Sequence, residues 1–502
     1  MRLRIADVFS DHMVLRHSRP NPVWGEAEPG AAVAVRLGGK ETACVADDAG
    51  RWLAWIDTPP AGIVARMEVE GCGERVAFED VACGEVWLAG GQSNMEQPLM
   101  CVNGARPWVD RAGESNVRLK RIPRRCGNAP EPGWHFFPCE GVDSPWERAN
   151  SEGAATFSAI GFVFGAMLSE KLSMPVGLIE CDWGGTPIQA WLPSAEIMTR
   201  EDTRADLAAF MDARAALGDG AGKAYEAYLR TVRQAAIHEP DYILNNLNDP
   251  LNFLREDRNI AFPPLGAIGD PQQPGVLYDH MVARVAPYGL SGVLWYQGEA
   301  NGMRGEAARY GGLFARLADN WRRAWRDPAL PFLTCQLAPF DTGLYWKDAA
   351  DWPELRAQQQ WCADTVRGVS MAVLLDLGME RNIHPLEKIP VADRLCRLAL
   401  EDVYGIPAEA RAPRPMTWER VEDGVRLRFD GPIALRDGLP PQLTVDDVPI
   451  PTDARITAPC ILELRRKTDA LPNGASYAQK GWLVPALFGA NGLPVAPFRC
   501  AI

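Results

Sequence analysis

The sequence lacks any run of apolar residues long enough to cross a membrane. Its longest apolar stretches, 159–168 and 371–375, fall well short of the roughly 18–20 residues that a membrane-spanning helix requires. It also lacks a dense Lys/Arg run, and 65 acidic residues outnumber 52 basic ones to give a formal net charge of −13. A surface of that sign repels a phosphate backbone. We therefore expect a soluble protein with neither a membrane nor a nucleic-acid partner.

Histidine is scarce and cysteine is scattered, which argues against metal chemistry. The six histidines form no H-x-x-x-H pair, and none has the spacing to a cysteine that zinc sites show. The twelve cysteines include no C-x-x-C pair, and several lie within apolar runs. In a chain of this length, buried reduced thiols are favoured over a disulfide framework. We expect no metal site.

The first residues do not have the pattern of a signal peptide. The stretch MRLRIADVFSDHMVL reaches polar Ser-Asp-His before an apolar segment has been built. We expect a cytoplasmic protein as the sequence stands, or a secreted or periplasmic one if a leader was removed. The oligomeric state stays open because no sequence feature reports it.

The length of 502 residues exceeds the ~100–200 residues of one domain and predicts several domains. Residues 1–80 contain short β-type runs separated by Gly, Pro and Asp turns about every 8–12 residues, a spacing typical of a small β-sandwich. Residues 406–502 return to β-type runs with many prolines. We predict an N-terminal, Ig-like β-sandwich at 1–80 and a C-terminal β-rich domain at 406–502 that packs back on the core.

Between these ends, residues 81–405 alternate strands with helices. The predicted strands are apolar runs at 85–89, 175–181, 291–296, 331–337 and 371–376. Apolar residues at helical spacing predict helices over 157–168, 310–325 and 386–403. This alternation predicts an α/β domain with a parallel sheet covered on both faces. The charged segment 195–245 belongs to a helical insertion at about 195–260, whose role, as a lid or otherwise, stays open.

Polar and glycine-rich segments follow four of the predicted strands. GGQSNM with Ser93 follows 85–89, DWGGTPIQAW follows 175–181, QGEANG follows 291–296, and LGMERNIHP follows 371–376. Each segment alone is typical of a turn or of a structural histidine. Because open parallel sheets bind ligands outside the carboxyl ends of their strands, the four segments together predict a functional site there.

These segments contain the groups that acyl transfer requires. Serine is a weak nucleophile that needs a neighbouring base, and His384 can supply one as neutral imidazole. The tetrahedral intermediate needs donors for its negative oxygen, and the candidates are the Ser93 N–H, the Gly185 N–H and the Gln297 side-chain amide. One such donor is worth roughly 3–4 kcal/mol of transition-state stabilisation.

Long sequence blocks lie in order along nearly the whole chain. They are FSDHMVL (9–15), PVWGEAEPG (22–30), GEVWLAGGQSNMEQPL (84–99), FSAIGFVFG (157–165), PVGLIECDWGGTPIQAW (175–191), PGVLYDHM (274–281), GVLWYQGEANG (292–302), IHPLEK (383–388) and GLPVAPFR (492–499). Together they resemble the sialate O-acetylesterase family, carbohydrate esterases of the SGNH-hydrolase (GDSL-like) superfamily.

The resemblance implies both a fold and a set of site residues. The fold would be a flavodoxin-like, three-layer SGNH-hydrolase domain flanked by β-sandwich domains. Ser93 would be the nucleophile, His384 the general base, and Gly185 and Gln297 would contribute to the oxyanion hole together with the Ser93 N–H. Gln297 stands where many members of the superfamily have asparagine.

The sequence departs from the superfamily pattern beside the histidine. An aspartate commonly lies two or three residues before it and orients the imidazole, but here those positions are Asn382 and Arg381. A neutral amide and a cation cannot supply the electrostatic effect of a carboxylate. We therefore favour a Ser–His dyad whose imidazole is held by a backbone carbonyl or by Asn382. The candidate replacement acids are Asp376, Glu380 and Glu299.

Substrate recognition has two interpretations at each position. The candidate substrate-binding residues are Gln92, Asn94, Trp183, Glu299 and Arg381. Trp183 and the nearby Trp191, Trp295 and Tyr296 either stack on a sugar ring or belong to the core. Arg381 either meets a substrate carboxylate, such as that of a sialic acid, or lies on the surface. Gln92 and Asn94 are expected chiefly to fix the loop around Ser93.

The favoured function is a cofactor-independent serine esterase that removes O-acetyl groups from a carbohydrate, most closely a sialate O-acetylesterase. An acetylxylan or other plant-glycan acetylesterase would use the same chemistry, because the motifs build the acyl-transfer site and not the sugar pocket. A non-catalytic glycan-binding protein is the alternative from another class. A glycosidase with paired carboxylates would leave the Ser, Gly and Gln positions unexplained.

Overall fold

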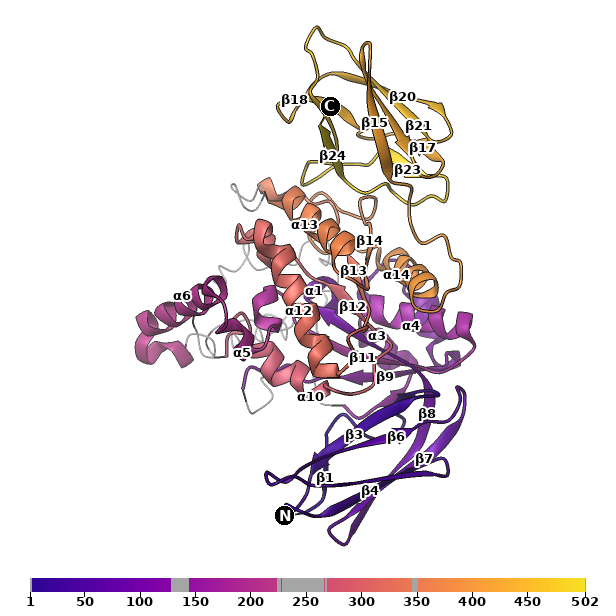
Figure 1. The fold of residues 1–502 in the computed structure, drawn as a ribbon, viewed down its shortest axis with the longest axis vertical. Coiled ribbons are helices and arrows are strands. Elements are labelled where there is room, and N and C mark those ends of the chain that lie inside the picture. Colours follow the sequence, from indigo (N-terminus) through magenta and orange to yellow (C-terminus); the bar gives the residue numbers. More distant parts are fainter. Residues whose placement is uncertain are drawn as a thin grey trace. The chain divides into compact units, whose positions relative to one another are not determined.

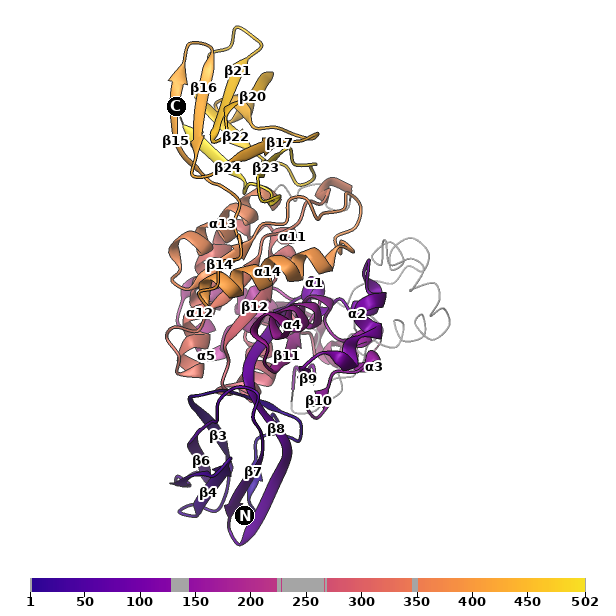
Figure 2. The ribbon, with the colours of Figure 1, turned by 90° about the vertical axis from the view of Figure 1, so that its right-hand side faces the viewer.

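The computed structural model describes residues 2–127, 144–223, 227, 266, 269–344 and 351–501. The chain forms two compact units, the first made of residues 1–297 and 313–332 and the second of residues 298–312 and 333–502. Figures 1 and 2 show the elements of both units. Helices and strands mix along the chain, which confirms the predicted α/β class.

Short antiparallel strands make up the N-terminal part of the first unit. β1 (Arg4–Ile5), β3 (Pro20–Glu26) and β6 (Arg51–Asp57) form one sheet, whereas β4 (Ala32–Leu37) pairs with β5 (Lys40–Val45) and β7 (Val64–Gly71) in another. More and less buried residues alternate along β4 and β6, so each strand turns one face to the core. The β-type runs of residues 1–80 are therefore confirmed as strands.

β8 (Glu74–Gly91) is one continuous strand that joins two parts of the first unit. Its first half pairs antiparallel with β7, from Glu74 opposite Gly71 to Ala82 opposite Val64. Residues 82–84 pair in parallel with β2 (Val14–Arg16), and residues 85–91 pair in parallel with β11 (Val176–Asp182). The strand does not break between residues 80 and 81, so the domain boundary placed there stays a prediction.

The parallel strands of the first unit follow the order β9 (Val117–Arg121), β11, β8 and β12 (Gly292–Tyr296). The short strand β10 (Glu147–Arg148) adds antiparallel to β9. Every residue of β11 and of β12 is buried, which explains why both strands read as uninterrupted apolar runs in the sequence.

Helices pack against both faces of these strands. α4 (Ala159–Leu172) contacts one face through Phe164, whose ring centroid lies 5.0 Å from that of Trp87. α12 (Tyr310–Trp325) contacts the sheet through Trp321, which lies 5.7 Å from Trp295. The register pairs Trp295 with Gly90, three residues after Trp87, so the two tryptophans point to opposite faces.

Further helices connect the strands of the first unit. They are α1 (Ser93–Glu96), α2 (Arg106–Asp110), α3 (Ser151–Thr156), α5 (Ser194–Ile197), α6 (Glu201–Leu217) and α10 (Ala283–Val285). The helix predicted from 157 begins instead at Ala159, because the Ser158 hydroxyl caps it by accepting from the Gly161 N–H at 3.1 Å. α5 and α6 occupy the described start of the predicted insertion at 195–260, and most of its residues after 223 lie outside the described residues.

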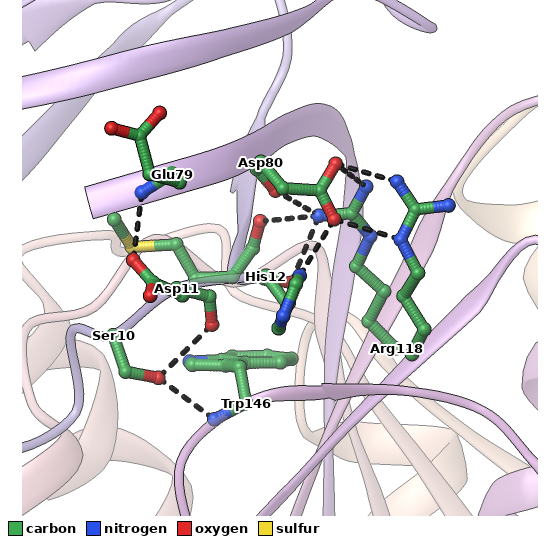
Figure 3. Close-up of polar contacts among 9 residues, drawn as sticks. Ser10, Asp11, His12, Glu79, Asp80, Arg118 and Trp146 are labelled. Carbon is green, nitrogen blue, oxygen red and sulfur yellow. Dashed lines mark hydrogen bonds and ion pairs between the residues drawn. The ribbon is translucent and has the colours of Figure 1, made fainter.

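A polar network joins residues 10–12 to the sheet of the first unit (Figure 3). Asp80, within β8, lies 2.7 Å from the His12 imidazole, 3.1 Å from the Arg118 guanidinium and 2.6 Å from the Arg148 guanidinium. These partners, the Arg148 hydrogen bond first, hold the pKa of Asp80 below its usual range. The block FSDHMVL therefore has a structural role at this joint.

The second unit places helices around a pair of neighbouring strands. Its elements are α11 (Glu299–Met303), β13 (Phe332–Cys335), α13 (Trp352–Thr365), β14 (Val369–Ala372) and α14 (Lys388–Asp402). The predicted strand at 371–376 is wrong in position, since β14 ends at Ala372. Leu375 leaves the strand and joins a hydrophobic core with Val425 and Leu427, so burial alone accounts for this apolar run.

Antiparallel strands make up the C-terminal part of the second unit. One sheet has the order β15 (Pro415–Val421), β16 (Gly424–Phe429), β21 (Ile461–Arg466) and β20 (Thr452–Ala458), and another has the order β19 (Val448–Pro449), β18 (Gln442–Val445), β22 (Gly474–Tyr477) and β24 (Phe498–Ala501). β17 (Ile433–Leu435) pairs with β23 (Leu487–Gly489). Buried Leu443, Leu462 and Leu464 contribute to their core, as the β-type runs of this region predict.

The part of the chain that the structure describes can be compared with the expectations for membrane spans, cysteines and metal sites. No helix in it is long and apolar enough to cross a membrane. Its cysteines are all free thiols, most of them buried, and Cys139 lies outside the described residues. No group of three His, Cys, Asp or Glu side chains among these residues is arranged to hold a metal ion.

Candidate active site

Ser93 lies where β8 ends and α1 begins. Gly91 has φ +136°, and a Cβ at this position would lie 2.1 Å from the carbonyl oxygen of Tyr296, so only glycine lets β8 and β12 approach this closely. The Gln92 N–H then donates to the same Tyr296 oxygen at 3.0 Å. The backbone turns into α1 at Ser93, whose side chain is only 3% exposed.

The turn after β11 lies against the Ser93 segment. The Trp183 N–H donates to the carbonyl oxygen of Gly91 at 3.1 Å, which joins the ends of the two strands. Gly185 has φ +73°, a conformation that favours glycine. The Thr186 hydroxyl closes the turn by donating to the Trp183 carbonyl at 2.7 Å. The sequence prediction that Ser93 and Gly185 share one end of the sheet is thus met within the first unit.

Gln297, directly after β12, ties these two segments together. Its Nε2 lies 3.1 Å from the carbonyl oxygen of Thr186 and 3.2 Å from Oε1 of Gln92. A side-chain amide has two hydrogens, so both are engaged in this geometry. Gln297 therefore acts here as a link between loops, and its predicted donation to an oxyanion requires one of these bonds to open. Gln92 fixes the loop, as expected.

Buried charges lie next to the same loops. Glu96, at the end of α1, accepts a hydrogen bond from the Gly184 N–H at 2.6 Å. Arg124 lies 2.7 Å from the Asp182 carboxylate and 3.5 Å from that of Glu96. Sequence analysis missed this contact, although Glu96 and Asp182 both stand inside matching blocks.

The aromatic side chains near these loops belong to the core. Trp183, Trp191, Trp295 and Tyr296 are each no more than 2% exposed. Trp191 packs edge to face on Trp295 with centroids 5.9 Å apart, and its Nε1 donates to Thr186 Oγ1 at 3.0 Å. The interpretation of these rings as core residues is therefore favoured over sugar stacking. Asn94, another candidate for substrate contact, is also buried, at 1% exposed.

His384 belongs to the second unit, in the segment before α14. It is 2% exposed, and burial first and the Lys388 cation second lower the pKa of its imidazole to about 3. The Asn382 side chain accepts from the backbone N–H of His384 at 2.9 Å, which fixes the loop that carries the ring. Asn382 thus orders the histidine through its backbone.

Lys388, the first residue of α14, is a functional candidate that sequence reasoning did not single out. It is 1% exposed, and its Nζ donates to the carbonyl oxygen of Pro385 at 2.6 Å. Burial lowers the pKa of Lys388 to about 7, against the opposing effect of the Glu299 carboxylate. Its position four residues after His384 was the available signal. The Lys388 cation adds to the effect of burial in disfavouring the charged form of the His384 imidazole.

The other candidate acids differ in their surroundings. Both carboxylate oxygens of Asp376 lie 2.7 Å from the guanidinium of Arg394, so this carboxylate forms a bidentate structural ion pair. Asp376 lies beyond β14, which ends at Ala372, and its role as a third acid stays a prediction beside this structural ion pair. Glu380 and Arg381 are both exposed, whereas Glu299 is 1% exposed.

Comparison with known proteins identifies the class of enzyme. A protein-family model described as a carbohydrate esterase, sialic acid-specific acetylesterase, matches residues 267–378. The sialate O-acetylesterase of Rattus norvegicus is 26% identical over 442 residues, which cover 80% of this chain and 74% of that relative. The sialate O-acetylesterase of Homo sapiens is 27% identical over 436 residues, which cover 80% of this chain and 71% of that relative. The crystal structure of a carbohydrate acetylesterase from Xanthomonas citri is 26% identical, with a TM-score of 0.76 and coverage of 99% of both chains.

In these matches the chain is similar to carbohydrate esterases, and the predicted esterase activity is confirmed. More narrowly, they confirm the predicted resemblance to the sialate O-acetylesterase family. The range 267–378 contains Gln297 and Glu299 but neither Ser93 nor His384. The roles of the individual site residues therefore stay predictions.

Proposed function

We propose that this protein releases acetate from O-acetylated sialic acids through an acyl-enzyme on Ser93. The observation that carries the proposal is the position of Ser93 at the end of β8, beside the Gly184–Gly185 turn and linked to it by Gln297. The backbone N–H groups of Ser93 and Gly185 supply the oxyanion donors. Arg381 is the proposed partner of the sialic acid carboxylate.

The proposed reaction proceeds in two steps. Ser93 Oγ attacks the acetyl carbonyl carbon while the imidazole of His384 takes the hydroxyl proton. Collapse of the tetrahedral intermediate expels the sugar oxygen, which receives that proton, and leaves acetyl-Ser93. Water then attacks the acetyl group as His384 takes its proton, and acetate leaves with the serine restored. No step needs a cofactor.

We further propose that the site works as a Ser–His dyad. The carboxylate of Asp376 is engaged by Arg394, and Asn382 supports His384 through its backbone N–H. Glu299, which is buried in the same unit as His384, and the exposed Glu380 are the other candidate acids.

The finer fold assignment is part of the proposal. We propose a three-layer SGNH-hydrolase domain at 81–405, an Ig-like β-sandwich at 1–80 and a β-rich domain at 406–502. The parallel order of β9, β11, β8 and β12, with α4 and α12 on opposite faces, supports the three layers.

The substrate assignment is tested by acetate release. The purified protein is incubated with 9-O-acetylated sialic acid and, in parallel, with acetylated xylan. The proposal expects acetate from the sialic acid and a loss of at least about a thousandfold in Ser93→Ala. Acetate from xylan alone would instead identify a plant-glycan esterase, and activity that survives Ser93→Ala would reject the serine mechanism.

A further inference from the structure

A buried ionic cluster connects the Ser93 segment to the Gly184–Gly185 turn within the first unit. Arg124 Nη2 lies 2.7 Å from Asp182 Oδ1 and 3.5 Å from Glu96 Oε1, and Arg124 Nε donates to the backbone oxygen of Asp182 at 2.8 Å. The other carboxylate oxygen of Glu96 accepts from the Gly184 N–H at 2.6 Å. Glu96, Arg124 and Asp182 are 3%, 7% and 2% exposed.

The cluster contains more carboxylates than guanidinium groups. Glu180, 6% exposed, adds a third carboxylate and lies 3.3 Å from Arg121. Burial first, and the neighbouring Glu180 next, raise the pKa of Asp182 well above its ordinary value. The carboxylates crowded around Arg124 therefore disfavour the charged form of Asp182.

Stability alone is a poor explanation for such an arrangement. Removing several ions from water costs about as much as their pairing returns, and apolar replacements of similar volume are often no less stable. What the cluster does provide is a fixed geometry, because Glu96 follows Ser93 by one turn of α1 and Gly184 precedes Gly185 by one residue.

We propose that Glu96 and Arg124 are positioning residues for acyl transfer. Glu96 holds the Gly184 N–H at a fixed place relative to Ser93 and so restrains the next peptide, which carries the Gly185 N–H, while Arg124 holds the Glu96 and Asp182 side chains. The inference rests on the proposed function, since it assumes that Ser93 is the nucleophile and Gly185 an oxyanion donor. Preorganised donors act only if they are correctly aimed, and a misplacement of 1 Å can reduce the rate about 100-fold.

A second link on the other side of Gly185 supports this inference independently. Gln297 Nε2 binds the Thr186 carbonyl oxygen, one residue after Gly185, and Oε1 of Gln92, one residue before Ser93. The turn is therefore held at Gly184 and at Thr186, on both sides of the residue that must present its N–H.

The test compares substitutions of Glu96 that keep or remove the hydrogen-bond acceptor. Glu96→Gln keeps a side-chain oxygen that can accept from the Gly184 N–H. Glu96→Met removes the acceptor at similar volume. With an aryl acetate ester as substrate, we expect Glu96→Met to lower kcat about 100-fold with KM within about twofold, and Glu96→Gln to recover kcat to within about fivefold of wild type.

Arg118 provides a matched control for a purely structural effect. It is 3% exposed, pairs with Asp80 and donates to the His12 carbonyl oxygen at 3.0 Å (Figure 3). It lies in the same unit as the Ser93 turn but further back in the sheet, because Arg118 pairs with Gly177 and Gly177 pairs with Val86, seven residues before Ser93. Arg118→Met should lower Tm as much as Arg124→Met does but leave kcat of the folded enzyme unchanged, whereas Arg124→Met should lower kcat at least tenfold.

Each outcome decides the inference. If the Glu96→Met and Arg118→Met variants lose kcat equally per folded molecule, or if Glu96→Gln is as slow as Glu96→Met, the positioning role is rejected. If Glu96→Met does not fold, the same decision rests on Glu96→Gln and on Arg124→Lys, which keeps the charge and should retain more kcat than Arg124→Met.

Ser93→Ala separates the two proposals. Full activity of Ser93→Ala would overturn the proposed function itself. An inactive Ser93→Ala together with a fully active Glu96→Met variant would overturn only the positioning role.

Discussion

Acidification from about pH 8 to about pH 6 should leave kcat/KM unchanged, because His384 stays neutral over this range. Burial first, and the Lys388 cation second, lower the pKa of His384 from 6.5 to about 3. At pH 6 such a group is protonated in about 0.1% of molecules, whereas an ordinary histidine is protonated in about three quarters of them. The neutral, active fraction of an ordinary histidine would thus fall about fourfold at pH 6, whereas the neutral fraction of His384 would not fall measurably.

The assay is kcat/KM for an aryl acetate ester from about pH 5 to about pH 8.5, with folding followed by near-UV circular dichroism. Lys388→Met removes the neighbouring cation and should raise the pKa of His384, which moves the acid limb of the profile upward. Lys467→Met, which changes a side chain that is 59% exposed in the same unit, is the control and should leave the profile unchanged. A wild-type acid limb with its midpoint near 6.5 would refute the reasoning.

Three further substitutions test other parts of the account. Asp376→Asn should lower Tm, because Arg394 is 7% exposed and loses its carboxylate, yet leave kcat within about twofold; a loss near 10⁴-fold would instead reveal a triad acid. Gly185→Ala should cost roughly 1–2 kcal/mol of stability because of its φ of +73°, and should lower kcat at least about tenfold; an unchanged kcat would exclude Gly185 from the oxyanion hole. Glu180, Glu96 and Arg124 face Asp182, and its pKa in the folded state is raised above the unfolded value of 3.8. The contribution of Asp182 to stability is therefore full below about pH 4 and is lost as the pH rises through the folded-state pKa. Asp182→Asn has no such proton to lose, so its Tm should rise relative to that of the wild type between about pH 5 and about pH 8. A Tm difference that does not change with pH would contradict the raised pKa of Asp182.

The strands that carry the candidate site could be predicted because the local sequence determines them. β11 and β12 are buried on both faces, so they appear as unbroken apolar runs. The glycine-rich segments after them indicate where the chain turns. The spacing of apolar residues also gave α12 its correct bounds, 310–325. Ser93 and Gly185 were brought together by reasoning from parallel strand ends alone.

The contacts that support the site could not be predicted, because they join residues far apart in the chain. Arg124 meets Asp182 across 58 residues, and no local pattern marks either side chain as buried. Lys388 reads as a surface residue at the start of a helix, yet it is 1% exposed. The strand predicted at 371–376 was misplaced because an apolar run that packs against the C-terminal strands resembles a strand.

Labelling of Ser93 by a fluorophosphonate tests the central claim most directly. Such a reagent phosphonylates an activated serine by displacement of fluoride, and intact mass and peptide mapping locate the adduct. The account predicts one phosphonyl group per chain, on the peptide that contains Ser93, with esterase activity lost in proportion. Complete labelling of Ser93 with activity retained, or inactivation with the label on another residue, would contradict it.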